Sequence, residues 1–312
     1  MVQRQRDVIS GLNTAGFISG YRGSPVGGYD QQLWNARKFL ENNHIKFQPG
    51  LNEDLAASAI WGSQQTNLFE GGKYDGVFGI WYGKGPGVDR CGDVFKHGNM
   101  SGPSKHGGVL LIAGDDHAAK SSTVPHQSEF AFMDASIPVL NPAGVQEILD
   151  YGVLGFAMSR FSGCWVAFKT TAENMDSSAS IDVAPDRVNI EIPDFNIPDG
   201  GLHIRWPDDW IEQEHRLHNY KLKAVRAFAR ANKIDKLIID SPKAKLGIVT
   251  TGKSYLDVRQ ALEDLGITEE KAATIGIRLY KIGMPWPLEP AGVHEFAEGL
   301  EEILVIEEKR PL

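Results

Sequence analysis

Short apolar runs alternate along the chain with longer stretches in which apolar residues recur at helical spacing. Five of these runs end in glycine or polar residues, a pattern typical of buried strands. They cover residues 16–20, 76–81, 108–113, 137–140 and 164–168. The intervening stretches 29–42, 54–68 and 145–159 are typical of helices. Strand–helix alternation of this kind predicts a largely parallel sheet with helices on both faces.

The pattern changes between residues 188 and 209, where Pro193, Pro198, Pro207 and a Gly-Gly pair interrupt any regular element. This stretch is interpreted as a linker. A long amphipathic helix is expected next, over residues 211–231. A second α/β unit then follows, with strands expected at 246–249, 277–281 and 303–306 and helices at 254–265 and 292–300. The sequence thus predicts an α/β protein in which a doubly wound parallel-sheet domain precedes a smaller α/β domain.

Composition narrows the class of protein. A chain of 312 residues with 42% hydrophobic and 23% charged residues is typical of a folded protein of about two domains. Because 40 acidic residues outnumber 32 basic ones, the net charge of -8 argues against nucleic-acid binding. No run approaches the roughly 18 apolar residues of a membrane span, and the first residues lack the apolar core of a signal peptide. We therefore expect a cytoplasmic protein without a membrane segment.

Cysteine content limits the redox chemistry of this chain. Only Cys91 and Cys164 are present, far apart and without a C-x-x-C pair. An iron–sulfur cluster or a cysteine-based zinc site needs more thiolates than two. Any iron–sulfur centre must therefore lie outside this chain.

Ligands in open α/β sheets bind at the carboxyl ends of the strands, and two loops there carry candidate residues. Residues 19–28 place glycines around Tyr21 and Arg22, but match neither the dinucleotide nor the P-loop pattern, so a tight structural turn is an equal alternative. In residues 49–57, Asn52 suits a helix N-cap. Glu53 could then be a first-turn acid favoured by the helix dipole and nothing more.

Two further loops are also rich in candidates. Residues 81–90 contain three glycines and a proline, which favours an irregular loop that opens a helix. Such a loop suits backbone contact with a cofactor, but a structural turn is an equal alternative. Residues 114–129 contain Asp, His and Ser. They lack the G-x-S-x-G elbow of many hydrolases and a second histidine at metal-ligand spacing. A polar cluster facing a shared cleft is favoured, and no metal ligand is assigned.

Several long segments, read in order, closely resemble one known family. The segments are GYRGSP, PGLNEDLAA, GIWYGKGPGVDR, GDDHAAKSSTVPHQSE, IPVLNPAGVQEILD, TTGKSYLDVRQAL, MPWPLEP and EEILVIEEKR. The resemblance is to the indolepyruvate ferredoxin oxidoreductase family in its long, fused form, one of the thiamine diphosphate-dependent 2-oxoacid:ferredoxin oxidoreductases. It extends over essentially the whole chain.

The resemblance implies a division into domains. Residues 1–195 resemble the pyrimidine-binding domain for thiamine diphosphate, 196–242 a linker and connecting helix, and 243–312 a transketolase C-terminal-like domain that is expected to be truncated. In such proteins the part that binds the diphosphate and Mg²⁺, and the [4Fe-4S] cysteines, lie downstream. The chain therefore resembles a fragment or one piece of a split enzyme, and it is not expected to be active alone.

The resemblance also implies roles for individual residues. Glu53 matches the glutamate that contacts N1′ of the aminopyrimidine, where a carboxyl group favours the imino tautomer that removes the thiazolium C2 proton. The other residues expected to line the cofactor are Tyr21, Arg22, Gly83, Lys84, Gly85, Pro86 and Gly87. The residues expected to border the substrate are Arg22, Ser24, Pro25, Asp115, Asp116, His117 and Lys120.

The implied reaction is oxidative decarboxylation of indolepyruvate or another arylpyruvate with coenzyme A, which gives an acyl-CoA and reduced ferredoxin. The downstream domains or a partner subunit are expected to complete the enzyme, and a homo-oligomer is expected. Two alternatives stay open. One is the same chemistry on another 2-oxoacid, and the other is a non-catalytic piece that contributes to a site only together with a partner chain.

Overall fold

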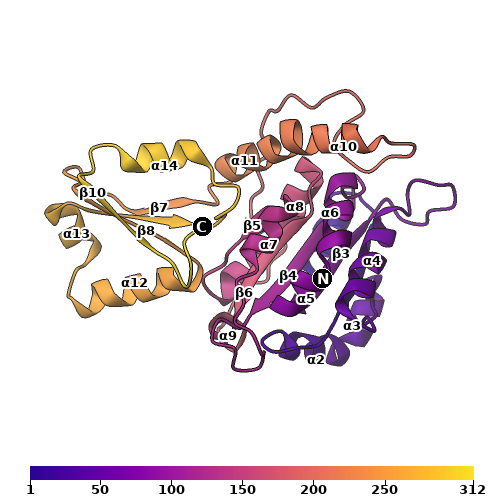
Figure 1. The fold of residues 1–312 in the computed structure, drawn as a ribbon, viewed down its shortest axis with the longest axis horizontal. Coiled ribbons are helices and arrows are strands. Elements are labelled where there is room, and N and C mark those ends of the chain that lie inside the picture. Colours follow the sequence, from indigo (N-terminus) through magenta and orange to yellow (C-terminus); the bar gives the residue numbers. More distant parts are fainter.

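The computed structural model describes residues 1–312 and contains two α/β domains, each built around its own sheet (Figure 1). The first sheet has six strands, all parallel, in the order β2-β1-β3-β4-β6-β5. These strands are β1 (Ala15–Gly20), β2 (Ile45–Phe47), β3 (Val77–Lys84), β4 (Val109–Asp115), β5 (Val139–Leu140) and β6 (Val166–Thr171). The predicted fold class is confirmed, while the short edge strand β2 was not predicted.

Helices cover both faces of this sheet, as a parallel sheet requires. Trp81 and Tyr82 are neighbours in β3 and both are fully buried, but they belong to separate hydrophobic clusters because successive side chains point to opposite faces. The helices are α1 (Val2–Ile9), α2 (Gly27–Asn35), α3 (Arg37–Asn42), α4 (Glu53–Gln64), α5 (Gly85–Arg90), α6 (Gly92–Ser101), α7 (Glu129–Asp134), α8 (Val145–Ser162) and α9 (Ala172–Met175).

Two predictions for this domain were inexact. The helix predicted over 29–42 is two helices, α2 and α3, which meet at Ala36. A helix does begin within residues 81–90, as predicted, but the irregular loop before it is absent, because β3 continues to Lys84 and α5 begins at Gly85. Pro86 lies in the first turn of α5. Proline is tolerated there because the N–H groups of the first turn have no hydrogen-bond partner within the helix, so the missing N–H of proline breaks no bond.

The helix predicted over 211–231 is interrupted. It consists of α10 (Trp210–Arg216), a π-helical turn η1 (Leu217–Lys221) and α11 (Leu222–Ala231). Lys221 is fully buried at the end of this turn and donates hydrogen bonds to the carbonyls of Asn99 and Met100 at the end of α6. The connecting helix is thereby attached to the first domain before it leads to the second (Figure 1).

The second sheet has the strand order β10-β8-β9-β7. Its elements are β7 (Lys236–Ile239), β8 (Leu246–Thr251), α12 (Gly252–Asp264), α13 (Glu269–Ile275), β9 (Ile277–Ile282), α14 (Pro290–Ala297) and β10 (Glu302–Ile306). β7 pairs antiparallel to β9 and was not predicted, because four residues that begin with lysine carry too little periodicity. No helix in either domain is both long and apolar enough to cross a bilayer.

Main-chain and side-chain bonds join the two domains. Val139 of β5 pairs with Trp286, and the N–H of Asn141 donates to the carbonyl of Gly283 at 2.9 Å. Lys281 of β9 is 1% exposed, forms an ion pair with Glu147 of α8 and lies 4.7 Å from the ring centre of Tyr255. The second domain is therefore packed against the first domain beside the carboxyl end of β5.

Candidate functional site

Glu53 is the first residue of α4 and is 9% exposed. The side chain of Asn52 accepts the N–H of Leu55 at 2.9 Å and caps the helix, as the sequence predicted. The indole N–H of the fully buried Trp81 donates to the main-chain carbonyl of Glu53 at 2.9 Å. The start of α4 is thus hydrogen-bonded to β3 of the sheet.

Two glycines leave room for the Glu53 side chain. A Cβ at Gly87 would lie 2.5 Å from Cγ of Glu53, and one at Gly83 would lie 3.4 Å from the same atom. A Cβ at Gly83 would also lie 2.7 Å from the ring of Trp81. The carboxyl group therefore lies against the end of β3 and the start of α5, in a space that exists because neither position has a side chain.

The loop after β1 contributes a more exposed wall. Tyr21, Arg22 and Ser24 are exposed, whereas Pro25 and Val26 are buried against Gly114 near the end of β4. The N–H of Tyr21 donates to the carbonyl of Tyr82 at 3.0 Å. The strand ends of β1, β3 and β4 are therefore adjacent, as the position of these loops predicted.

Residues 116–128 form a loop, here called the 116–128 loop, that crosses this edge of the sheet. Lys84 donates from Nζ to the carbonyl of Ser121 at 3.0 Å. The ring of His126 lies against Gly85, and its Nε2 is 2.8 Å from Oδ2 of Asp89 in α5. Lys84, Gly85 and the 116–128 loop are thus in contact, while Lys120 projects from the loop as an exposed side chain.

Asp115 and Asp116 are neighbours in sequence with opposite electrostatic environments. Asp115 is fully buried and accepts the N–H and hydroxyl of Ser128, and burial, assisted by the nearby Glu129, raises its pKa to about 6. Asp116 accepts the N–H groups of Ser121 and Lys120 and the hydroxyl of Ser121, and these bonds lower its pKa. Asp116 shapes the 116–128 loop, and Asp115 lies beneath it.

Behind Asp115 lies a buried charged cluster that the sequence did not reveal. It contains Lys169 of β6, Glu129 of α7 and Glu308, which follows β10. Although burial opposes a charge on Lys169, the three carboxyl groups of Glu129, Glu308 and Asp115 raise its pKa. The only available signal was a lysine that directly follows the apolar residues of β6, which must be buried if the strand is central.

His117 lies at the edge of this cluster. Its Nδ1 is 3.7 Å from Oε2 of Glu308, and its Nε2 is 3.9 Å from Oδ2 of Asp115. Burial and the positive charges of Lys169 and Lys309 lower its pKa to about 4, so the ring is neutral at pH 7. The structure therefore places Asp115 and His117 together, beside the domain junction.

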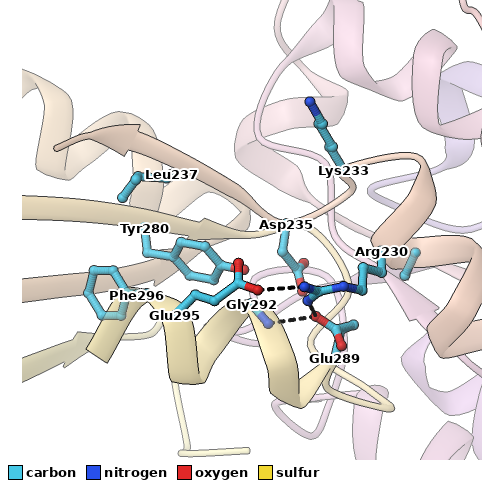
Figure 2. A pocket seen from close by; sticks show the side chains of 10 residues that line it. Arg230, Lys233, Asp235, Leu237, Tyr280, Glu289, Gly292, Glu295 and Phe296 are labelled. Atoms are coloured by element: carbon cyan, nitrogen blue, oxygen red, sulfur yellow. Dashed lines mark hydrogen bonds and ion pairs between the residues drawn. The ribbon is translucent and has the colours of Figure 1, made fainter. Parts of the chain in front are cut away.

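A separate hollow of about 380 Å³ lies between α11, β7, β9 and α14, and Figure 2 shows the side chains that line it. Arg230 forms ion pairs with Glu289 and Glu295, and Oε2 of Glu289 accepts the N–H of Gly292 at 2.7 Å. Burial raises the pKa of Asp235 to about 6 against the effect of two main-chain N–H donors. These charges are largely paired with one another, and none of the predicted site residues lies here.

Comparison with protein families gives one match, to the indolepyruvate oxidoreductase domain, over residues 236–312. The chain is 28% identical to the indolepyruvate oxidoreductase subunit IorA of Pyrococcus horikoshii over 212 residues, which are 66% of this chain and 31% of that protein. It is 23% identical to the subunit IorA of Methanothermobacter marburgensis over 299 residues, 94% of this chain and 44% of that protein. The predicted resemblance to the indolepyruvate oxidoreductase family is confirmed. The chain spans less than half the length of these two family members.

Solved structures agree with this assignment at the level of the fold. A 2-oxoglutarate:ferredoxin oxidoreductase from Magnetococcus marinus superposes with a TM-score of 0.66 and 14% identity, over 97% of this chain and 56% of that chain. A transketolase from Campylobacter jejuni superposes with a TM-score of 0.53 and 11% identity, over 98% of this chain and 39% of that chain. Both domains and their connection are therefore shared with these enzymes.

Proposed function

We propose that this chain supplies the aminopyrimidine side of a thiamine diphosphate site in a 2-oxoacid:ferredoxin oxidoreductase. The observation that carries the proposal is the buried carboxyl group of Glu53, held against Gly83 and Gly87 at the carboxyl edge of the parallel sheet. A buried carboxyl group in a space kept open by glycines suits a planar heterocycle with a ring nitrogen to hydrogen-bond. The resemblance to IorA subunits supports the same assignment.

The residues of this chain have defined tasks in the proposed site. Glu53 would form a hydrogen bond with N1′ of the aminopyrimidine and would favour the tautomer whose 4′ nitrogen can act as a base. Trp81 holds the main chain of Glu53, and Gly83 and Gly87 leave room for its side chain. Both glycines also line the cofactor in this proposal. When bound, the thiazolium of the cofactor supplies the carbon nucleophile and electron sink for decarboxylation. Tyr21, Arg22, Lys84, Gly85 and Pro86 complete the cofactor wall in this proposal.

The substrate is proposed to lie between the β1 loop and the 116–128 loop. Arg22 and Lys120 are exposed cations that can pair with the carboxylate of a 2-oxoacid, and Ser24 and Pro25 border the same space. The contacts of Asp115 with Ser128, of Asp116 with Ser121 and of His117 with Glu308 give these three residues the task of shaping this wall. Indolepyruvate, oxidised with coenzyme A and ferredoxin, is the substrate we favour, because it is named for the IorA relatives.

The remaining parts of the site are proposed to come from outside residues 1–312. Leu51, Leu55 and Tyr21 are 86%, 51% and 45% exposed, and lie on or next to the two elements that carry Glu53 and the β1 loop. Such apolar side chains around a candidate site are suited to cover by another domain or subunit. We propose that this partner brings the groups that bind Mg²⁺ and the diphosphate, and that the [4Fe-4S] clusters lie there too, with a cytoplasmic homo-oligomer as the complete enzyme.

The test compares Glu53→Gln with Asp54→Asn in this chain, assembled with the partner that completes the enzyme. Hydrogen–deuterium exchange at C2 of bound thiamine diphosphate is measured by NMR alongside cofactor affinity. Glu53→Gln should slow C2 exchange by about 10²–10⁴-fold with cofactor still bound, and Asp54→Asn should not. Equal exchange in both variants would reduce Glu53 to a first-turn acid of α4, and would favour the non-catalytic alternative.

A further inference from the structure

The segment of residues 308–310 leaves the second domain after β10 and contacts the 116–128 loop of the first domain. Gln127 donates from Nε2 to the carbonyl of Arg310 at 3.0 Å, and the N–H and Nε of Arg310 donate to Oε1 of Gln127 at 3.2 and 3.1 Å. The guanidinium carbon of Arg310 is 4.2 Å from the ring centre of Phe130. Both ends of the buried Gln127 amide are therefore bonded to a single residue of the segment.

The other end of the loop is held by the two preceding residues. Lys309 donates from Nζ to the carbonyl of His117 at 2.7 Å. Glu308 accepts the N–H of Lys253 at 2.8 Å, and its other oxygen is 3.7 Å from Nζ of Lys169 and 3.7 Å from Nδ1 of His117. Consecutive residues thus hold positions 117 and 127, close to the two ends of the loop.

Between these two held positions, the loop contacts the candidate site. Ser121 accepts a hydrogen bond from Lys84, and its hydroxyl is 3.5 Å from the carbonyl of Ser24. His126 lies against Gly85. A movement of the loop would therefore displace Lys84 and change the space beside Ser24.

We infer that Glu308, Lys309 and Arg310 are positioning residues for the 116–128 loop, through which the second domain sets the geometry of the candidate site. Glu308 and Lys309 act on the His117 end of the loop, and Arg310 acts on the Gln127 end. The hold on the loop follows from the contacts alone. Its bearing on catalysis rests on the proposed function.

The test is hydrogen–deuterium exchange of the full chain without cofactor, read by mass spectrometry. Arg310→Met keeps an apolar side chain over Phe130 but removes the guanidinium donors and charge. Exchange of peptides from the 116–128 loop should become about tenfold faster, with the rest of the chain unchanged. Arg226→Met is the matched control, because Arg226 is exposed on α11 and has no ion pair or side-chain hydrogen bond.

Two further variants separate positioning from general stability. Arg310→Lys keeps a cation beside Phe130 and one donor for Gln127, so loop exchange should return towards wild type. Loop exchange in the double variant Gln127→Met/Arg310→Met should be no faster than in Gln127→Met alone, because Gln127→Met already removes the bond from Nε of Arg310 to Oε1 of Gln127 that Arg310→Met removes. Unchanged loop exchange in Arg310→Met, an equal rise across both domains, or additive effects in the double variant would overturn the inference. Cofactor is absent throughout, so such a failure leaves the Glu53 proposal untouched.

Discussion

Asp115→Asn should stabilise the chain at neutral pH, although it removes a buried, doubly hydrogen-bonded carboxylate. Asn can keep both bonds, because its Oδ1 can accept the N–H of Ser128 while its Nδ2 donates to the Ser128 hydroxyl. The substitution therefore removes the charge and preserves the hydrogen-bond pattern. Its effect on the free energy of unfolding then depends on the cost of ionising Asp115 in the fold.

The pKa of Asp115 fixes the sign and size of that effect. Folding raises this pKa from 3.8 to about 6, so the folded chain binds more protons than the unfolded chain between these values. The contribution of Asp115 to the free energy of unfolding is therefore fully present below pH 4 and is lost as the pH rises through 6. Two pKa units correspond to about 3 kcal/mol, with the attraction of Lys169 already included. Asp115→Asn should recover up to about that amount above pH 6.

Urea unfolding followed by circular dichroism from pH 4 to 8 measures this prediction. The difference between Asp115→Asn and wild type should grow with pH and level off above 6. Asp116→Asn is the matched control, for which we expect the opposite change in the free energy of unfolding. The pKa of Asp116 is lowered, and an amide would place an N–H against one of its donors, so this variant should destabilise at pH 7. A destabilised Asp115→Asn at pH 7.5, with an unchanged pH slope, would refute the reasoning.

Three other measurements follow from the structure. Burial lowers the pKa of Lys221 from 10.5 to about 8, so wild type should gain about 3 kcal/mol of stability between pH 8 and 10.5, a gain that Lys221→Met should lack in unfolding titrations. Gly87→Ala should weaken thiamine diphosphate binding to the assembled enzyme about tenfold or more in calorimetry, because its methyl group displaces the Glu53 side chain, while Gly92→Ala, with no neighbour within 4 Å, should bind normally. The isolated chain should bind thiamine diphosphate and Mg²⁺ weakly, and tight Mg²⁺-dependent binding would contradict the proposed division of the site.

Periodicity and glycine positions predicted the strands of the first sheet because these strands are buried on both faces and read as continuous apolar runs. β2 and β7 were missed since edge strands of three and four residues bury few side chains. The π turn at 217–221 was also missed, and the buried side chain at its end contacts a distant element. Lys221 reaches the carbonyls that end α6, a contact with a residue about 120 positions away.

Some features of the candidate site were likewise predictable from the sequence, and others were not. The rule that parallel strands end at one edge correctly predicted that the loops of β1, β3 and β4 are adjacent. It could not separate Asp115 from Asp116, because the difference arises from Ser128 on one side and from Ser121 and Lys120 on the other. Sequence position also could not place Glu308 beside Lys169, since that contact depends on how the second domain packs against the first.

The second domain packs against the β6 side of the candidate site, so this side is buried while the β1 side is exposed. On the β6 side, Lys169 pairs with Glu129 and Glu308 in a buried cluster, and the 308–310 segment holds the loop above them. On the β1 side, Tyr21, Arg22 and Ser24 are exposed. A substrate or partner would therefore meet a preformed wall on one side and an adaptable one on the other. Under the proposed function, selectivity among 2-oxoacids should therefore respond more to substitutions in the β1 loop than to changes in the buried cluster.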